Sequence, residues 1–192
     1  MEPGPHLDRL NEALRADGEG QRRALAGDEP GARERFAAAE AAYWASWELA
    51  PPGSYGRLVG MLKAAILAGD AGVAAARAHA ALDGAPPSPT AAWARALAAL
   101  ASDDDADAAR AAREMRAGDA AFGRAADAVA ALAARDRAAY DTAVDAIVDD
   151  FGGRSTHLTG VPIADTALVL ERLAESRGMA RRPASSLLPA AT

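Results

Sequence analysis

Small and apolar residues recur at intervals of three and four along most of the chain, which is the period of an amphipathic α-helix. Phe36, Ala39, Tyr43 and Trp47 follow this period in a helix expected over residues 28–49. Similar stripes predict helices over residues 54–69, 70–82, 90–101, 103–118, 119–134, 137–151 and 161–177. The chain is therefore expected to be all-α.

A four-residue pattern, Leu-Ala-Gly-Asp, occurs at residues 25–28 and 67–70, and weaker copies occur at residues 100–103 and 132–136. Glycine or a small residue suits the left-handed position after a helix, and aspartate accepts hydrogen bonds from the first N–H groups of the next helix. Each copy therefore predicts a helix end, a tight turn and a helix start. The pattern favours an array of antiparallel helical hairpins, with a closed α-helical bundle as the alternative.

Glycine and proline interrupt this pattern at both ends of the chain. Gly18 and Gly20 predict a break after a short helix over residues 6–16. Residues 181–192 contain two prolines and are expected to form an extended tail. The remaining residues, 1–180, are expected to form a single helical domain.

Composition and charge narrow the classes of function. The net charge is −6, from 27 acidic and 21 basic residues, and no basic stripe suits a nucleic acid. There is no cysteine, no signal-peptide pattern and no apolar run long enough to cross a membrane, so a cytoplasmic location without a membrane partner is expected. Lys63 is the only lysine, and this bias toward arginine suggests a GC-rich bacterial coding sequence.

The spacing of small residues resembles that of the tetratricopeptide repeat family. After Gly69 come Ala74, Ala78, Ala81 and Leu82, with Pro86 closing the unit, and Ala32, Phe36 and Ala39 follow Gly27 at comparable offsets. Leu67, Leu100 and Leu132 are spaced by 33 and 32 residues, close to the period of about 34 residues in that family. The resemblance implies a right-handed superhelix that binds other proteins on a concave surface.

The chain offers no convincing catalytic centre. His6, His79 and His157 are far apart and lack the spacing of metal ligands. Ser155, His157 and Asp165 have the residue types of a triad, but no nucleophile-elbow pattern surrounds Ser155. We therefore expect no enzymatic activity, no metal site and no cofactor. If an active site existed, Asp141, Asp145 and His157 would be its best candidates.

Two features are candidate partner-binding sites. Asp141, Asp145 and Asp149 recur every four residues and would form an acidic ridge on one helix face, suited to a basic partner. Alternatively, the ridge is a solvated face. Trp44 lies off the face that Phe36, Tyr43 and Trp47 share, so it is expected to be half exposed, and exposed tryptophans are frequent at binding hot spots.

The sequence therefore favours a non-catalytic scaffold that binds another protein. The segment from Val161 to Gly178 also resembles the C-terminal region of alanine-rich, acidic bacterial immunity proteins, which implies an immunity or antitoxin-like role. The alternative is a helical pocket for a small molecule or lipid, with Met61, Met115, Trp93 and Phe122 lining an apolar cavity.

Overall fold

The structure is a computed structural model that describes residues 4–190. Residues 1–3 of the predicted domain and 191–192 of the predicted tail lie outside the described residues. Within residues 4–190 the chain forms nine α-helices and no strand, which confirms the all-α prediction. The helices are α1 (Pro5–Leu25), α2 (Glu29–Leu49), α3 (Gly56–Ala68), α4 (Gly72–Ala81), α5 (Pro89–Ala101), α6 (Asp105–Met115), α7 (Ala120–Ala133), α8 (Arg137–Gly152) and α9 (Asp165–Glu175).

The four turns predicted from the Leu-Ala-Gly-Asp pattern share one backbone geometry. Each contains a left-handed residue, with φ of 79° at Gly27, 93° at Gly69, 55° at Asp103 and 55° at Arg135. In each, the next amide donates a hydrogen bond to the carbonyl five residues earlier, from Asp28 to Arg23, Asp70 to Ala65, Asp104 to Ala99 and Asp136 to Ala131. This bond satisfies a carbonyl that the helix end leaves free. The predicted turns are confirmed.

The aspartates after these turns cap the following helices at three of the four positions. Asp28, Asp104 and Asp136 each accept a hydrogen bond from an amide three residues later. The prediction that Asp70 caps the fourth helix is wrong. Helix α4 begins at Gly72, so Ala71 is the residue before it and no side chain caps its N-terminus.

Helix α1 is continuous, and the predicted break at Gly18 and Gly20 is wrong. A Cβ at Gly20 would lie 2.8 Å from the Phe36 ring, and one at Gly18 would lie 3.3 Å from Thr159. Both glycines therefore serve close packing inside a helix. The lower helix propensity of glycine, about 1 kcal/mol per residue, is offset by contacts with segments distant in sequence.

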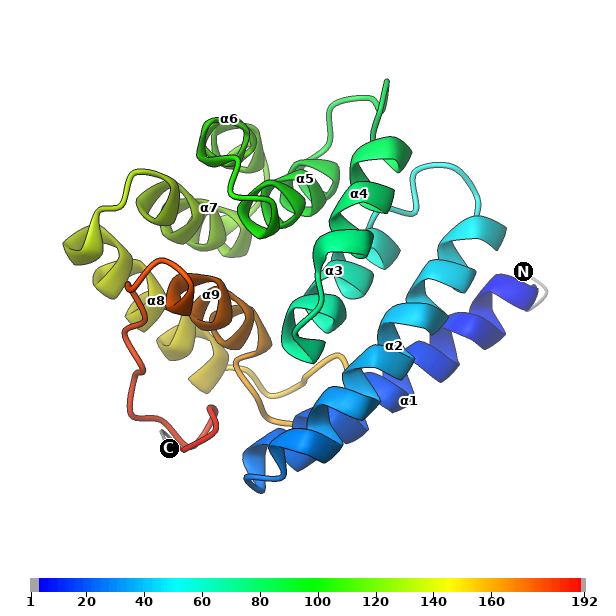
Figure 1. Ribbon diagram of the computed structural model, residues 1–192, viewed down its shortest axis with the longest axis horizontal. Coiled ribbons are helices and arrows are strands. Elements are labelled where there is room, and N and C mark those ends of the chain that lie inside the picture. The colour runs from blue at the N-terminus through cyan, green and yellow to red at the C-terminus, as the bar shows by residue number, and fades with distance from the viewer. Residues whose placement is uncertain (1–3, 191–192) are drawn as a thin grey trace.

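Consecutive helices pack side by side as antiparallel pairs. Helices α1 and α2 form a long hairpin along one edge of the molecule, α3 lies against α2, and α5 to α8 follow on the other side (Figure 1). Helix α9 lies between these two parts and contacts α3, α7 and α8. The last helix therefore packs against an early one, so the array contains contacts between its two ends.

Ion pairs hold α9 and the residues just after it to the other helices. Lys63 Nζ on α3 lies 2.9 Å from an Asp165 carboxylate oxygen, and Arg172 lies 2.7 Å from Glu29. Beyond the end of α9, the almost fully buried Arg177 side chain donates to the Leu100 carbonyl at 2.9 Å and lies 3.0 Å from Asp103 and 3.2 Å from Asp105.

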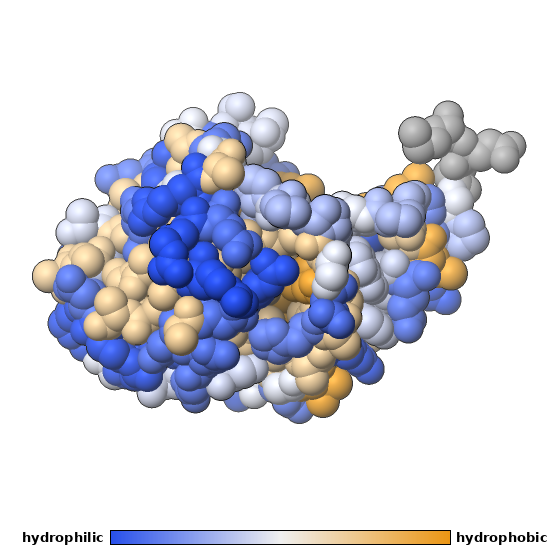
Figure 2. Space-filling view, turned by 90° about the horizontal axis from the view of Figure 1, so that it is seen from above, coloured by the Kyte–Doolittle hydropathy of each residue, from blue (hydrophilic) through white to orange (hydrophobic). Residues whose placement is uncertain are grey.

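One face of the molecule carries a patch of hydrophilic side chains (Figure 2). Figure 2 shows hydrophilic side chains gathered over the upper face where α6 lies. Many of these charges pair with one another, as in Arg95 with Glu114 and Arg135 with Asp105. Among residues 4–190, no helix combines the length and apolar character that crossing a membrane requires.

Candidate functional site

The structure places Trp44 of α2 beneath Arg77 of α4. Its ring is half-buried, and the Arg77 guanidinium lies over it at 5.1 Å from the ring centroid. Arg77 also pairs with Glu40 at 3.0 Å. The ring is therefore partly covered by a cation of its own chain. Its role in partner binding stays a prediction.

The three ridge aspartates lie along α8 in different environments. Asp149 is exposed, whereas Asp141 and Asp145 are half-buried. Asp145 lies 3.3 Å from Arg181, which follows α9. One carboxylate oxygen of Asp141 is buried without a hydrogen-bond partner among the described residues. The ridge therefore already accepts one arginine of its own chain.

That arginine belongs to the C-terminal segment, residues 179–190, which forms no helix and folds back onto α9. The main anchor is the buried Glu171 carboxylate. It accepts hydrogen bonds from the backbone N–H groups of Arg181, at 3.1 Å, and Arg182. It also accepts one from the Tyr140 hydroxyl at 2.7 Å. A buried carboxylate without these donors would cost several kcal/mol, so the carboxylate and the segment stabilise each other.

Further contacts fix the rest of the C-terminal segment. The Ala164 N–H donates to the Leu187 carbonyl at 2.9 Å, and Leu188 and Met179 are buried in the core. The segment is thus held through its main chain and by apolar side chains at both ends.

A cavity of about 520 Å³ lies between this segment, α9, α3 and the α1–α2 turn, and we call it the C-terminal groove. Its floor consists of the apolar side chains Ala24, Phe36, Leu67, Leu168 and Leu188. Its rim carries acidic and basic residues that pair with one another, namely Glu29, Arg33, Arg172, Glu175 and Arg182. The volume falls within the range of about 300–1,000 Å³ typical of ligand sites.

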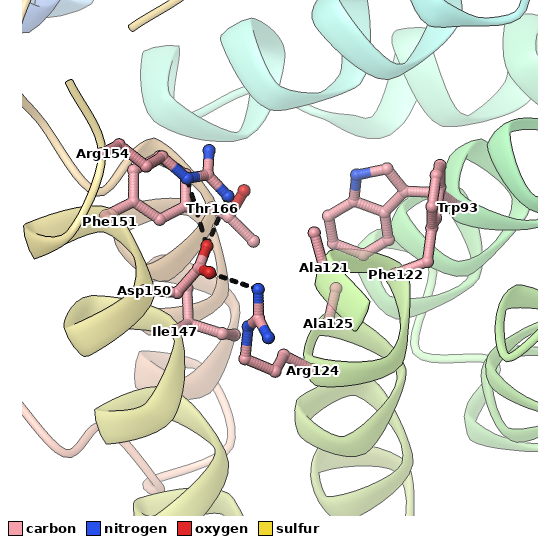
Figure 3. A pocket seen from close by; sticks show the side chains of 10 residues that line it. All are labelled: Trp93, Ala121, Phe122, Arg124, Ala125, Ile147, Asp150, Phe151, Arg154 and Thr166. Atoms are coloured by element: carbon pink, nitrogen blue, oxygen red, sulfur yellow. Dashed lines mark hydrogen bonds and ion pairs between the residues drawn. The ribbon is translucent and has the colours of Figure 1, made fainter. Parts of the chain in front are cut away.

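A second, smaller cavity of about 200 Å³ lies between α5, α7 and α8, and we call it the aromatic cavity. Figure 3 shows Trp93 and Phe122 on one side and Phe151 with Arg154 on the other. Asp150 lies between two arginines: Arg154 donates to it at 2.6 and 3.1 Å, and Arg124 also donates to it. The Arg154 guanidinium lies 3.7 Å from the centroid of the Phe151 ring.

The residues predicted to line an apolar pocket separate into two pairs. Trp93 and Phe122 line the aromatic cavity. Met61 and Met115 are fully buried in the core and line none of the cavities described here. Both methionines therefore pack helices together.

A buried polar cluster lies where α1, α2, α3 and α9 meet. Asp17 accepts hydrogen bonds from the Tyr43 hydroxyl and from the Gln21 amide, both at 3.1 Å. Burial, and next the charge of Asp165, raises the pKa of Asp17 to about 6. Burial, and next Asp17, also raises the pKa of Tyr43 above its ordinary value. Lys63 Nζ donates to Asp165 and, at 3.0 Å, to the Thr166 hydroxyl.

The structure does not assemble the catalytic candidates considered from the sequence. His157 packs against Phe151 near the end of α8, whereas Asp141 lies near its start. Asp165 pairs with Lys63, and no hydrogen bond joins Ser155, His157 and Asp165 among the described residues. Within residues 4–190 no group of three or more acidic, histidine or cysteine side chains is placed to hold a metal ion.

Sequence reasoning missed the anchor Glu171, the cluster around Asp17 and the Arg124–Asp150–Arg154 group. Each of the three includes a partner 26 or more residues away, namely Tyr140 with Glu171, Tyr43 with Asp17 and Arg124 with Asp150. The only local signal was that Lys63 is the one lysine of the chain. Helix periodicity gives no information on such pairs, because it reports only which face of each helix is buried.

The fold and these sites define an all-α protein of sequentially packed helices, with one cavity between α9 and the C-terminal segment and another between α5, α7 and α8. Comparison with family models, with curated proteins and with solved structures gives no match. Function is therefore argued from the sites themselves.

Proposed function

We propose that this protein is a non-catalytic helical scaffold that binds an extended segment of another protein in the C-terminal groove. The observation that supports this best is the groove itself, with an apolar floor, a rim of paired charges and a wall made of an anchored extended segment. Apolar centres with polar rims are typical of protein interfaces. The partner would place apolar side chains against Phe36, Leu67 and Leu168.

The proposed partner segment is basic. Asp149 is exposed on α8, and Asp145, one turn earlier, accepts an arginine of the C-terminal segment that also forms a wall of the groove. The net charge of −6 would also steer a basic protein toward this surface. An immunity or antitoxin-like role, in which the protein binds a basic toxin, is the specific form of this proposal.

The helix contacts support a tetratricopeptide-like arrangement in modified form. Alternate helices contact in order, α3 with α5, α5 with α7 and α7 with α9, as expected where successive hairpins stack. Helix α9 also contacts α3, which supports the closed alternative. We therefore propose a stacked array whose inner side is filled by α9, so that partner binding uses the C-terminal groove and not an open concave surface.

A second candidate function, binding of a small molecule, is favoured by one observation. Trp93 and Phe122 line a cavity that also contains Arg124 and Arg154. This cavity is separate from the C-terminal groove, and the residues lining the two do not overlap. A scaffold function and a ligand function are therefore compatible in this protein.

Partner capture from a lysate of the host tests the scaffold function. Leu168→Glu places a charge on the groove floor, and Val73→Glu places the same charge at an exposed apolar residue on α4. We expect one stoichiometric partner with the unmodified protein and with Val73→Glu, and its loss with Leu168→Glu. With the purified partner, the unmodified protein and Val73→Glu should bind with similar Kd, and Leu168→Glu should bind with a higher Kd.

The acidic ridge is tested with the same purified partner. Replacing Asp141, Asp145 and Asp149 by asparagine should weaken binding, and more at low than at high salt, because the attraction is electrostatic. Equal binding by Leu168→Glu and Val73→Glu would contradict the groove as the binding site. Normal binding by the triple variant would show that the ridge is only a solvated face.

A further inference from the structure

The aromatic cavity has an excess of positive charge at one end. Arg124 and Arg154 share a single carboxylate, that of Asp150, so one of the two positive charges is not neutralised within the group. All three side chains are only partly exposed, between 27 and 37%. Each guanidinium has five N–H groups, and Asp150 takes only two from Arg154 and one from Arg124. Donors therefore remain for a second anion.

The guanidinium of Arg154 is held in place before any ligand arrives. Its face lies on the Phe151 ring, with 3.7 Å between the guanidinium carbon and the ring centroid. Stacking of this kind leaves the N–H groups at the edge of the guanidinium free to point sideways. A planar, fixed fork of donors matches a carboxylate, because both can form two parallel hydrogen bonds.

The other walls are apolar and aromatic apart from Thr166, whose hydroxyl accepts a hydrogen bond from Lys63. Trp93 and Phe122, with Ala121 and Ala125, face Phe151 and Ile147 across the cavity (Figure 3). Aromatic rings favour offset or edge-to-face contact with another ring. The volume of about 200 Å³ lies below that of most drug-sized sites, which limits the ligand to a single ring with a short substituent.

We infer that the aromatic cavity binds a small aromatic carboxylate, with its ring against Trp93 and Phe122 and its carboxylate on Arg124 and Arg154. An inorganic anion would leave the aromatic walls without a contact. A cationic ring would meet two guanidinium groups. This site does not depend on the proposed scaffold function, because it uses none of the residues of the C-terminal groove.

Calorimetric titration of the full chain with benzoate tests this inference. Benzamide has the same shape without the charge, and benzylamine has the opposite charge. We expect saturable one-to-one binding of benzoate, and binding of benzamide and benzylamine weaker by about tenfold or more, since neither has a carboxylate to accept charge-assisted hydrogen bonds from the two arginines. Absence of benzoate binding, or equal binding of benzamide, would overturn the inference without any variant.

Variants then locate the site. Arg124→Gln and Arg154→Gln should each weaken benzoate binding about tenfold or more, whereas Asp150→Asn should strengthen it, because it removes the competing carboxylate. Arg116→Gln is the matched control, since Arg116 pairs with Asp127 outside the cavity. Thermal unfolding of each variant checks that it folds. Benzoate binding that is unchanged in both cavity arginine variants would refute this site.

Discussion

Asp17 is the residue whose charge conflicts most with its surroundings. It lies within α1, and burial together with the nearby Asp165 favours its neutral form. The Tyr43 hydroxyl, the Gln21 amide and Lys63 favour the charged form but do not compensate fully, so the pKa is about 6 instead of 3.8. The folded protein therefore binds a proton here more tightly than the unfolded chain does.

This difference predicts how stability changes with pH. Between about pH 4 and 6 the folded state holds more protons than the unfolded state, so the free energy of unfolding falls as pH rises and becomes level above pH 6. The loss amounts to at most about 3 kcal/mol, from about 1.4 kcal/mol per pKa unit. Asp17→Asn removes this titration. The free energy of unfolding of the variant, minus that of the unmodified protein, should therefore increase from pH 4 to pH 7.

Urea unfolding at pH 4 and at pH 7 measures this change in the relative stability of Asp17→Asn. Glu12→Gln is the control, because it removes an exposed carboxylate from the same helix. Between pH 4 and pH 7, the difference in free energy of unfolding between Glu12→Gln and the unmodified protein should change by no more than a few tenths of a kcal/mol. If Asp17→Asn behaves like Glu12→Gln, the Asp17 carboxyl is not destabilised by burial.

At the scale of the element, local signals in the sequence were sufficient for most helices and their turns. Gly27 and Gly69 predicted left-handed turns because that conformation favours glycine whatever lies around it. The same residue type misled the prediction for α1. Gly20 is required by the ring of Phe36, 16 residues away, and no local pattern reports that contact.

Two glycine-to-alanine variants separate these effects. Gly123→Ala, in α7, meets nothing within 4 Å and should raise the free energy of unfolding by about 0.5–1 kcal/mol through helix propensity. Gly20→Ala gains the same propensity but forces the Phe36 ring to move, so it should lower the free energy by about 1–3 kcal/mol. Denaturant unfolding gives both values, and stabilisation by Gly20→Ala would show that the α1–α2 contact is loose.

At the scale of the whole molecule, few local signals reported how α9 is held. The anchor Glu171 lies in a helix whose pattern is ordinary, and two of its donors belong to a segment expected only to be extended. The aromatic cavity likewise joins Trp93, Phe122 and Phe151 from three helices. Such sites depend on how helices are placed in space, whereas periodicity determines only which face of each helix turns inward.

A variant of Arg177 measures how much the contacts at the end of α9 stabilise the protein. Its side chain is almost fully buried and links the end of α9 to Leu100, Asp103 and Asp105 at the α5–α6 turn. Arg177→Ala should lower the free energy of unfolding by about 1.5–3 kcal/mol, because it removes a buried side chain together with its charged hydrogen bonds to the Leu100 carbonyl and to Asp105. Arg116→Ala removes an exposed pair and should cost less than about 1 kcal/mol. Equal effects in chemical denaturation would contradict this role of Arg177.

The contacts between α9 and the first three helices also affect how the protein folds during synthesis. Glu29 and Lys63 are translated more than 100 residues before their partners Arg172 and Asp165. Until α9 leaves the ribosome, the apolar side chains of α3 that pack against α9 are exposed to solvent. The nascent chain therefore exposes these side chains until α9 has been made, and we expect its final compaction only after α9 has emerged.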